Sequence, residues 1–325
     1  MSRRTTTARF SLAAALIAAL SLTGAAAGST AAGEPDGLYS ASNGDGVGGF
    51  VQLDKTDATA TTLGSPVEGV ALTSVEVVNG LGYAIGEVLE TGTFAFWTWD
   101  IATGAVLSSV PISSPAGVIE GMWALDTTPD GLFLTYAVFT YPEVDDPWIS
   151  SIDPATGSLT PLVNTYSVDD GRLFEGIATN PVNGVTYALA DYNDGIPAYS
   201  PVDLAAGTVG DSISFPEIYD NLGFGYFSEG DFDATGVLWF TYSGEPGSVA
   251  RTNGPAEVGV DATELGTPDI LSKAITVGQT AVFPVVPAAP QLAATGFPVA
   301  PFAGGAAALL IAGLGLMVVR RRAAA

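Results

Sequence analysis

Short apolar runs broken by turn residues dominate the middle of the chain, between residues 34 and 280. Valine, threonine and aromatic residues fill the runs, and glycine, proline, asparagine and aspartate separate them. Residues of the first group favour the pleated surface of a sheet, whereas those of the second group favour turns. Signals for helices are almost absent. The pattern therefore predicts an all-β region of many short strands.

Two markers repeat along this region with a period of about 50 residues. A Glu-Gly pair begins at Glu68, Glu120, Glu175 and Glu229, at intervals of 52, 55 and 54 residues. A turn led by aspartate begins at Asp54, Asp100, Asp153 and Asp203, at intervals of 46, 53 and 50 residues. An aspartate that accepts a hydrogen bond from the backbone two residues on, followed by a glycine with positive φ, makes a compact hairpin loop. Two markers with one period indicate a structural repeat.

Each period contains four predicted strands. In one unit they cover residues 122–125, 132–139, 148–152 and 158–163, and in the next 177–179, 185–190, 198–202 and 208–215. The first unit has strands at 37–42, 49–53 and 59–63 but lacks the preceding inner strand, which 270–277 would supply. Four antiparallel strands in such a period predict a β-propeller of about five blades over residues 37–280, closed by its two chain ends. Tandem β-sandwiches are the alternative.

The repeats resemble the quinoprotein and YVTN-type propellers in their period and turn chemistry. Because propeller blades stack face to face, we expect apolar residues on both faces of a strand to be core. Phe94, Phe96, Trp97 and Trp99 follow this pattern within one strand.

The N-terminus has the features of a secretory signal peptide, predicted over residues 1–27. Arg3, Arg4 and Arg9 precede an apolar stretch over 10–22, and three alanines offer a cleavage site before Gly28. The stretch is too short and wrongly flanked for a spanning helix, although an uncleaved anchor is the alternative. Residues 28–36 form a short linker.

The C-terminus combines a short motif, an apolar segment and a basic tail. Leu292, Ala293, Ala294, Thr295 and Gly296 precede an apolar run over 297–319, and Arg320, Arg321 and Arg322 follow it. At ~1.5 Å per residue, a helix of 23 residues spans a hydrocarbon core of ~30 Å, and the arginines would stop transfer on the cytoplasmic side. Residues 281–291, rich in proline and alanine, suit an extended stalk. Residues 320–325 form the tail.

This arrangement resembles the cell-wall sorting signal of Gram-positive surface proteins, in the Leu-Ala-x-Thr-Gly variant read by class E sortases of actinobacteria. The resemblance implies that a sortase cleaves the Thr295–Gly296 bond and joins Thr295 to a peptidoglycan precursor. The mature protein would then be anchored to the cell wall without a membrane helix. An ordinary single-pass membrane anchor is the alternative.

The charge of the chain is strongly one-sided. Between the two terminal segments, four basic residues stand against 34 acidic ones, a balance of −30. Such a region repels nucleic acid, which needs Lys and Arg contacts, and attracts cations. No cysteine is present, so the fold depends on core burial without disulfides.

The absence of histidine and cysteine excludes several chemistries. A Ser-His-Asp triad, a Cys-His pair and the usual zinc sites need residues that the chain lacks. Carboxylate chemistry remains, as calcium binding or glycoside hydrolysis. If Glu68, Glu120, Glu175 and Glu229 each open an inner strand, they would meet at one end of the channel and form a cation site, with calcium as the candidate ion. The alternative is that each Glu-Gly pair only serves the repeat.

The sequence therefore predicts a secreted, wall-anchored surface protein that displays a non-catalytic propeller for binding or adhesion to an extracellular ligand. No catalytic residues are recognised. The alternatives are a carboxylate-dependent cell-surface hydrolase, such as a glycosidase, and a structural coat component.

Overall fold

The computed structural model describes residues 37–42, 47–140, 145–165, 173–191, 197–216, 222, 227–242, 248–256, 260–268 and 274–279. This part of the chain contains 21 β-strands. Among the described residues, no helix is long and apolar enough to cross a membrane. The predicted signal peptide, linker, stalk, sorting motif, apolar segment and basic tail lie outside the described residues.

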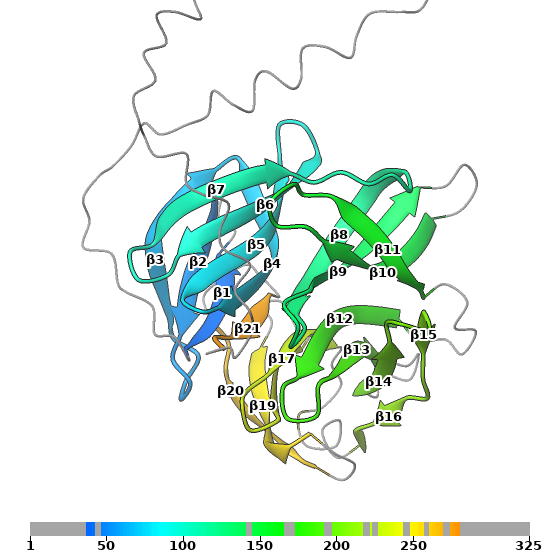
Figure 1. The fold of residues 1–325 in the computed structure, drawn as a ribbon. Helices are drawn as coiled ribbons and strands as arrows, with labels where there is room; N and C mark the ends of the chain where they lie inside the picture. Colours follow the sequence, from blue (N-terminus) through cyan, green and yellow to red (C-terminus); the bar gives the residue numbers. More distant parts are fainter. Residues whose placement is uncertain are drawn as a thin grey trace, which may run out of the picture. The chain divides into compact units, whose positions relative to one another are not determined.

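The strands form five antiparallel sheets, which we number as blades in chain order (Figure 1). Blade 1 consists of β21 (Ile275–Val277), β1 (Leu38–Ser42), β2 (Val47–Leu53) and β3 (Ala60–Glu68). Blade 2 consists of β4 (Val70–Val78), β5 (Leu81–Val88), β6 (Thr93–Asp100) and β7 (Ala105–Pro111). Blade 3 consists of β8 (Val118–Thr127), β9 (Phe133–Thr140), β10 (Asp145–Ile152) and β11 (Leu159–Asn164).

Blades 4 and 5 complete the ring. Blade 4 consists of β12 (Leu173–Asn180), β13 (Val185–Asp191), β14 (Pro197–Asp203), β15 (Thr208–Val209) and β16 (Ile213–Ser214). Blade 5 consists of β17 (Phe227–Phe232), β18 (Val237–Tyr242), β19 (Ser248–Pro255) and β20 (Ala262–Gly266). The inner strands β4, β8, β12, β17 and β21 contact one another around the axis. The fold is thus a five-bladed β-propeller, as the repeat predicts.

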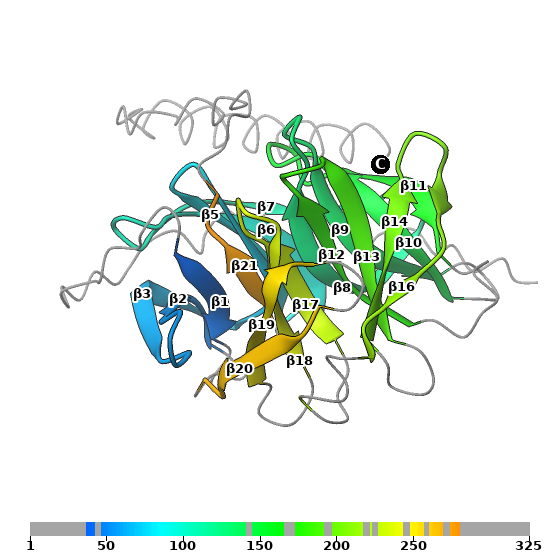
Figure 2. The same cartoon turned by 90° about the horizontal axis from the view of Figure 1, so that it is seen from below.

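The two ends of the described chain close the ring within blade 1 (Figure 2). In the β21–β1 ladder, Val277 lies opposite Leu38 and Ile275 opposite Ser40. The N–H of Gly278 also donates to the carbonyl of Gly37 at 2.8 Å. The predicted inner strand at residues 270–277 is confirmed for Ile275–Val277, whereas residues 270–273 lie outside the described residues. The pairing covers the inner edge of β1.

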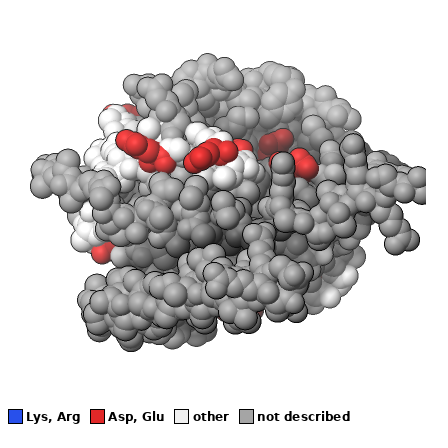
Figure 3. Space-filling view, turned by 90° about the horizontal axis from the view of Figure 1, so that it is seen from above, with Lys and Arg blue, Asp and Glu red and all other residues white. Residues whose placement is uncertain are grey.

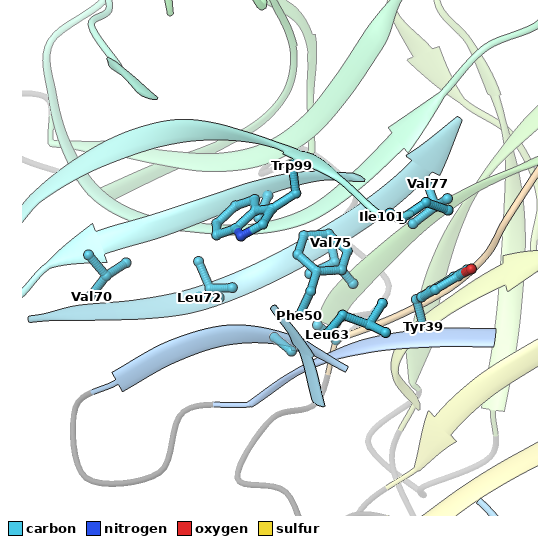
Figure 4. Packing of buried hydrophobic residues seen from close by; sticks show 12 residues of the cluster. Tyr39, Phe50, Leu63, Val70, Leu72, Val75, Val77, Trp99 and Ile101 are labelled. Carbon is cyan, nitrogen blue, oxygen red and sulfur yellow. The ribbon is translucent and has the colours of Figure 1, made fainter. Parts of the chain in front are cut away.

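The apolar core is divided into five clusters, one between each pair of adjacent blades. Strand β6 supplies two of them. Phe94 and Phe96 pack toward blade 3, whereas Trp99 packs toward blade 1, where its ring lies 5.1 Å from that of Phe50 (Figure 4). Both faces of a blade are therefore buried, as expected for stacked sheets, and the ring is stabilised mainly by burial between the blades.

The aspartate-led turns adopt the predicted conformation. In blade 2, Asp100 Oδ1 accepts the N–H of Ala102 at 2.9 Å, and the N–H of Gly104 donates to the carbonyl of Asp100 at 2.7 Å. The same pair of bonds recurs in the turns that begin at Asp54, Asp153 and Asp203. Gly104 has a φ of +68°, and alanine occupies the equivalent position in blade 1, where Ala58 has a φ of +58°.

The glycine of this turn also touches the preceding blade. A Cβ at Gly104 would lie 2.2 Å from the Cα of Gly64 in β3, and one at Gly157 would lie 2.2 Å from the carbonyl oxygen of Pro111 in β7. These distances are too short for any side chain. Glycine therefore serves both the backbone of the turn and the close approach of neighbouring blades.

The outer edge of blade 4 differs from the prediction. Residues 208–215 are predicted as one strand, but they form β15 and β16, which pair with opposite ends of β14. The break lies at Pro201 of β14, which has no N–H to donate to the outer strand. Its carbonyl instead accepts the N–H of Gly210 at 2.8 Å.

Candidate functional site

The four glutamates of the Glu-Gly repeat do not share one environment. Glu120, Glu175 and Glu229 lie in inner strands, as predicted, whereas Glu68 is the last residue of the outer strand β3. Glu68 and Glu120 are exposed and Glu175 is partly buried, but Glu229 is 3% exposed. Within the described residues, no three acidic side chains are arranged to hold a metal ion. Calcium binding stays a prediction, tested by a fall in melting temperature on addition of EGTA.

A shift of one residue explains why Glu229 alone is buried. Glu120 and Glu175 are the extra residues of β-bulges in β8 and β12, because each lies at a break in the pairing register. In β17 the extra residue is Ser228, so Glu229 occupies the position after the bulge. A shift of one residue in a strand turns the side chain to the other face. In blade 5 the Glu-Gly pair therefore lies one residue further from the bulge than in blades 3 and 4, and its glutamate faces inward.

Three further acidic residues are buried together with Glu229 on the inner strands. Glu76 in β4, Asp126 in β8, and Glu229 and Asp231 in β17 are all 1–3% exposed. We call these four residues the axial carboxyl cluster. Sequence reasoning found only Glu229. A usable signal was present, because Glu76, Asp126, Thr179 and Asp231 follow one another at intervals of 50, 53 and 52 residues inside apolar strands.

Hydrogen bonds connect the axial carboxyl cluster to every blade. The hydroxyl of Ser74 in blade 2 donates to Glu229, and that of Thr179 in blade 4 donates to Asp126. Thr276 of blade 1 places its hydroxyl oxygen 3.1 Å from Oε2 of Glu76 and 2.9 Å from Oδ2 of Asp231. The N–H of Val277 donates to the same Asp231 oxygen at 2.8 Å. The cluster therefore holds the five inner strands in register with one another.

Burial raises the pKa of all four carboxyls. The pKa of Asp126 is raised to about 6 by burial, against the hydrogen bonds of Thr179 and backbone N–H groups. Burial and the charge of Asp126 raise the pKa of Asp231 to about 8. The pKa of Glu76 lies well above its ordinary value because of burial and then the charges of Asp231 and Asp126. Burial likewise raises the pKa of Glu229, although Ser74 and backbone donors oppose it. Chemically, the cluster can retain protons at neutral pH.

The two basic residues of the described part lie away from this cluster. The ammonium nitrogen of Lys55 lies 5.7 Å from the ring centre of Trp239, and the guanidinium carbon of Arg251 lies 5.4 Å from it. Trp239 is buried, and its indole N–H donates to Asp233 at 3.0 Å. These cations bind an aromatic ring between blades 5 and 1 and do not appear among the charges that act on the axial carboxyls.

The fold and the site together define the described part as a five-bladed β-propeller with a buried carboxyl cluster on its axis. No protein-family model matches the chain, and no curated protein matches it.

Several solved structures resemble the chain. TolB from Acinetobacter baumannii is 16% identical, with a TM-score of 0.42, over 71% of this chain and 54% of its own. A luciferin-regenerating enzyme is 12% identical, with a TM-score of 0.45, over 72% of this chain and 75% of its own. The Dos1 propeller is 10% identical, with a TM-score of 0.34, over 63% of this chain and 51% of its own. The chain thus spans about half of TolB, and likenesses at this level do not bear on activity.

Proposed function

We propose that this chain is an exported surface protein whose propeller is a non-catalytic module for binding or adhesion. The observation that carries this proposal is that the acidic side chains on the axis are turned into the ring and away from solvent. The axial carboxyls are almost completely buried and accept hydrogen bonds from residues of the ring itself. Groups used in this way stabilise the scaffold, which leaves loops and outer surfaces for contact with a ligand.

The terminal segments support display outside the cell. Residues 1–27 have the composition of a signal peptide, and residues 292–325 have the order of a sorting signal. A class E-like sortase would cleave after Thr295 and join it to a peptidoglycan precursor. The stalk over residues 281–291 would then separate the propeller from the wall.

The surface of the propeller supports an extracellular ligand other than nucleic acid. Figure 3 shows acidic side chains, and no lysine or arginine, among the described residues on one face. The region between the terminal segments carries a balance of −30. Such a surface disfavours polyanions and favours neutral or cationic partners.

A glycosidase is the second candidate, because one pair of carboxyls lies close together. Oε2 of Glu76 and Oδ2 of Asp231 both contact the hydroxyl of Thr276, so they lie no more than about 6 Å apart. Retaining glycosidases hold their two carboxyls at ~5–5.5 Å. However, Glu76 and Asp231 are 1–2% exposed, and the hydroxyl of Thr276 already contacts both carboxyls. The arrangement therefore favours binding over hydrolysis.

Anchoring is tested by Thr295→Ala in the native host. The variant should leave the fraction that is released only by digestion of peptidoglycan and appear in the membrane or the medium. Thr160→Ala, at an exposed threonine of β11, is the control and should remain in the wall fraction. Unchanged wall linkage of Thr295→Ala would refute the anchoring proposal.

Binding and hydrolysis are separated by incubating the purified chain with insoluble cell-surface polysaccharides. Sedimentation with the polymer, without release of reducing ends, supports the binding module. Release of reducing ends that Glu76→Gln abolishes would establish the glycosidase instead.

A further inference from the structure

The hydroxyl of Thr276 stands between two carboxyl groups but has only one hydrogen to donate. Its oxygen lies 3.1 Å from Oε2 of Glu76 and 2.9 Å from Oδ2 of Asp231. Both contacts are hydrogen bonds only if one carboxyl is protonated and donates to the hydroxyl oxygen. With two ionised carboxylates, one of these contacts would bring a buried charge against an oxygen lone pair.

The backbone decides which carboxyl holds the proton. Oδ2 of Asp231 already accepts the N–H of Val277 at 2.8 Å, and Oδ1 accepts the N–H of Phe232 at 2.7 Å. Asp231 is therefore arranged as an acceptor on both oxygens, as an ionised carboxylate is. Within the described part of the chain Glu76 has Thr276 as its hydrogen-bond partner and no backbone donor, so Glu76 is the protonated partner. The hydrogen bonds then run from Glu76 to Thr276 and from Thr276 to Asp231.

Buried carboxyl oxygens without a partner independently indicate that the cluster holds a proton. Oε1 of Glu76 and Oδ1 of Asp126 are inaccessible to solvent and have no hydrogen-bond partner within the described part of the chain. A buried carboxylate with an unpaired oxygen is much costlier than a neutral acid in the same place. The charges that act on Glu76 come from Asp231, Asp126 and Glu229, and all are negative. A proton on the cluster relieves this repulsion.

We propose that the axis of the propeller binds a proton on Glu76, shared through Thr276 with Asp231, and that this proton locks the ring and makes its stability depend on external pH. This inference concerns the propeller alone and does not depend on how the chain is anchored. The charges of Asp231 and Glu229 of β17 and of Asp126 of β8 act on Glu76, and Glu76 acts in turn on Tyr83 of β5. The strands that contact β4 also carry Glu120 of β8, Glu87 of β5 and Tyr39 of β1.

The direction of the effect follows from proton linkage. A carboxyl with a raised pKa in the folded state binds more protons folded than unfolded. Its contribution is complete below the ordinary range of glutamate and is lost as the pH rises through the folded pKa. Burial and the negative charges of Asp231, Asp126 and Glu229 raise the pKa of Glu76 well above its ordinary value. The ring should therefore be most stable in acid and lose stability as the pH rises through the folded pKa of Glu76.

The test measures the melting temperature of the full chain in mild detergent between pH 5 and pH 9. The wild type should lose on the order of 5 °C or more across this range. Glu76→Gln should lose less than half as much, because its amide donates to Thr276 at every pH. Glu120→Gln, an exposed glutamate of the inner strand β8, should behave as the wild type. An equal loss in Glu76→Gln and the wild type would overturn the proposal.

Two further measurements keep the proposal testable if Glu76→Gln folds poorly. Infrared spectra of the wild type at pH 7 should contain the carbonyl band of a buried protonated carboxyl group, and its absence would overturn the proposal. Calcium chloride should leave the loss of melting temperature between pH 5 and pH 9 unchanged. A rise in melting temperature with calcium, together with a flat pH dependence, would show that the cluster binds a cation instead of a proton.

Discussion

The hydroxyl of Ser74 donates a hydrogen bond to Oε1 of Glu229 although 155 positions separate them in the chain. Ser74 belongs to blade 2 and Glu229 to blade 5, and blade 1 packs between these two blades. The bond therefore crosses the axis and joins blades that are not neighbours. Stacked blades bury apolar area only against the next blade, so contacts of this kind fix the ring as a whole.

Ser74→Ala should destabilise the protein by about 1.5–3 kcal/mol, because a buried carboxyl loses a donor that nothing replaces. Urea denaturation of the full chain measures this loss. Ser108→Ala, an exposed serine of the outer strand β7, is the matched control and should change stability by less than about 0.5 kcal/mol. Equal effects of the two substitutions would contradict a role for the bond across the axis.

Two glycines at the same position of the aspartate-led turn should respond differently to alanine. Gly104 and Gly207 have φ values of +68° and +69°. A Cβ at Gly207 would lie 3.2 Å from the carbonyl oxygen of Leu162, whereas one at Gly104 would lie 2.2 Å from Gly64. Gly207→Ala should cost about 1–2 kcal/mol from the left-handed backbone. Gly104→Ala should cost clearly more, since blades 1 and 2 must also move apart. Thermal unfolding compares the two, and a smaller loss for Gly104→Ala would contradict this account of the close contact.

Asp126→Asn should weaken the pH dependence of stability in a defined window. Burial raises the pKa of Asp126 from 3.8 to about 6, so the folded protein binds the proton more tightly than the unfolded chain. The wild type therefore loses stability as the pH rises through this window, and asparagine has no proton to lose. Urea midpoints at pH 4 and pH 7 should differ less in the variant. Asp130→Asn, in the exposed turn of the same blade, should retain the wild-type difference.

Lys55→Met should reduce stability by about 0.5–1 kcal/mol, because the ammonium group in blade 1 stacks on Trp239 in blade 5. Lys55→Arg keeps a cation at this position and should retain most of the stability. Chemical denaturation at low and high salt provides the measurement. Full stability of Lys55→Met would show that the contact between cation and ring contributes nothing to the closure.

The elements that the sequence predicts well are those whose causes are local. Each aspartate-led turn is closed by bonds within five positions, such as Asp100 with Ala102 and Gly104. The period of these turns then sets the number of blades, and the incomplete first unit indicates closure by the last strand. Residue types and spacing carry all of this information.

The axial carboxyl cluster could not be found in the same way, because its bonds join distant positions. Thr276 contacts Glu76 across 200 positions and Asp231 across 45. The Glu-Gly marker also gives the wrong residues. In β8 and β12 the bulge lies at the glutamate of the pair, whereas in β17 it lies one residue before the glutamate. Spacing alone does not reveal the position of a bulge, and the bulge decides which side chain faces inward.

The position of β21 has a consequence for the order in which the protein assembles. Strand β1 near the N-terminus stays without its inner neighbour until residues 275–277 have been made and have reached the same compartment. The four later blades can stack in sequence as they emerge, but β1 keeps an open edge that is ready to pair with a foreign strand. A chain that is truncated before Ile275 would therefore be prone to aggregation, even if its other four sheets are correctly folded.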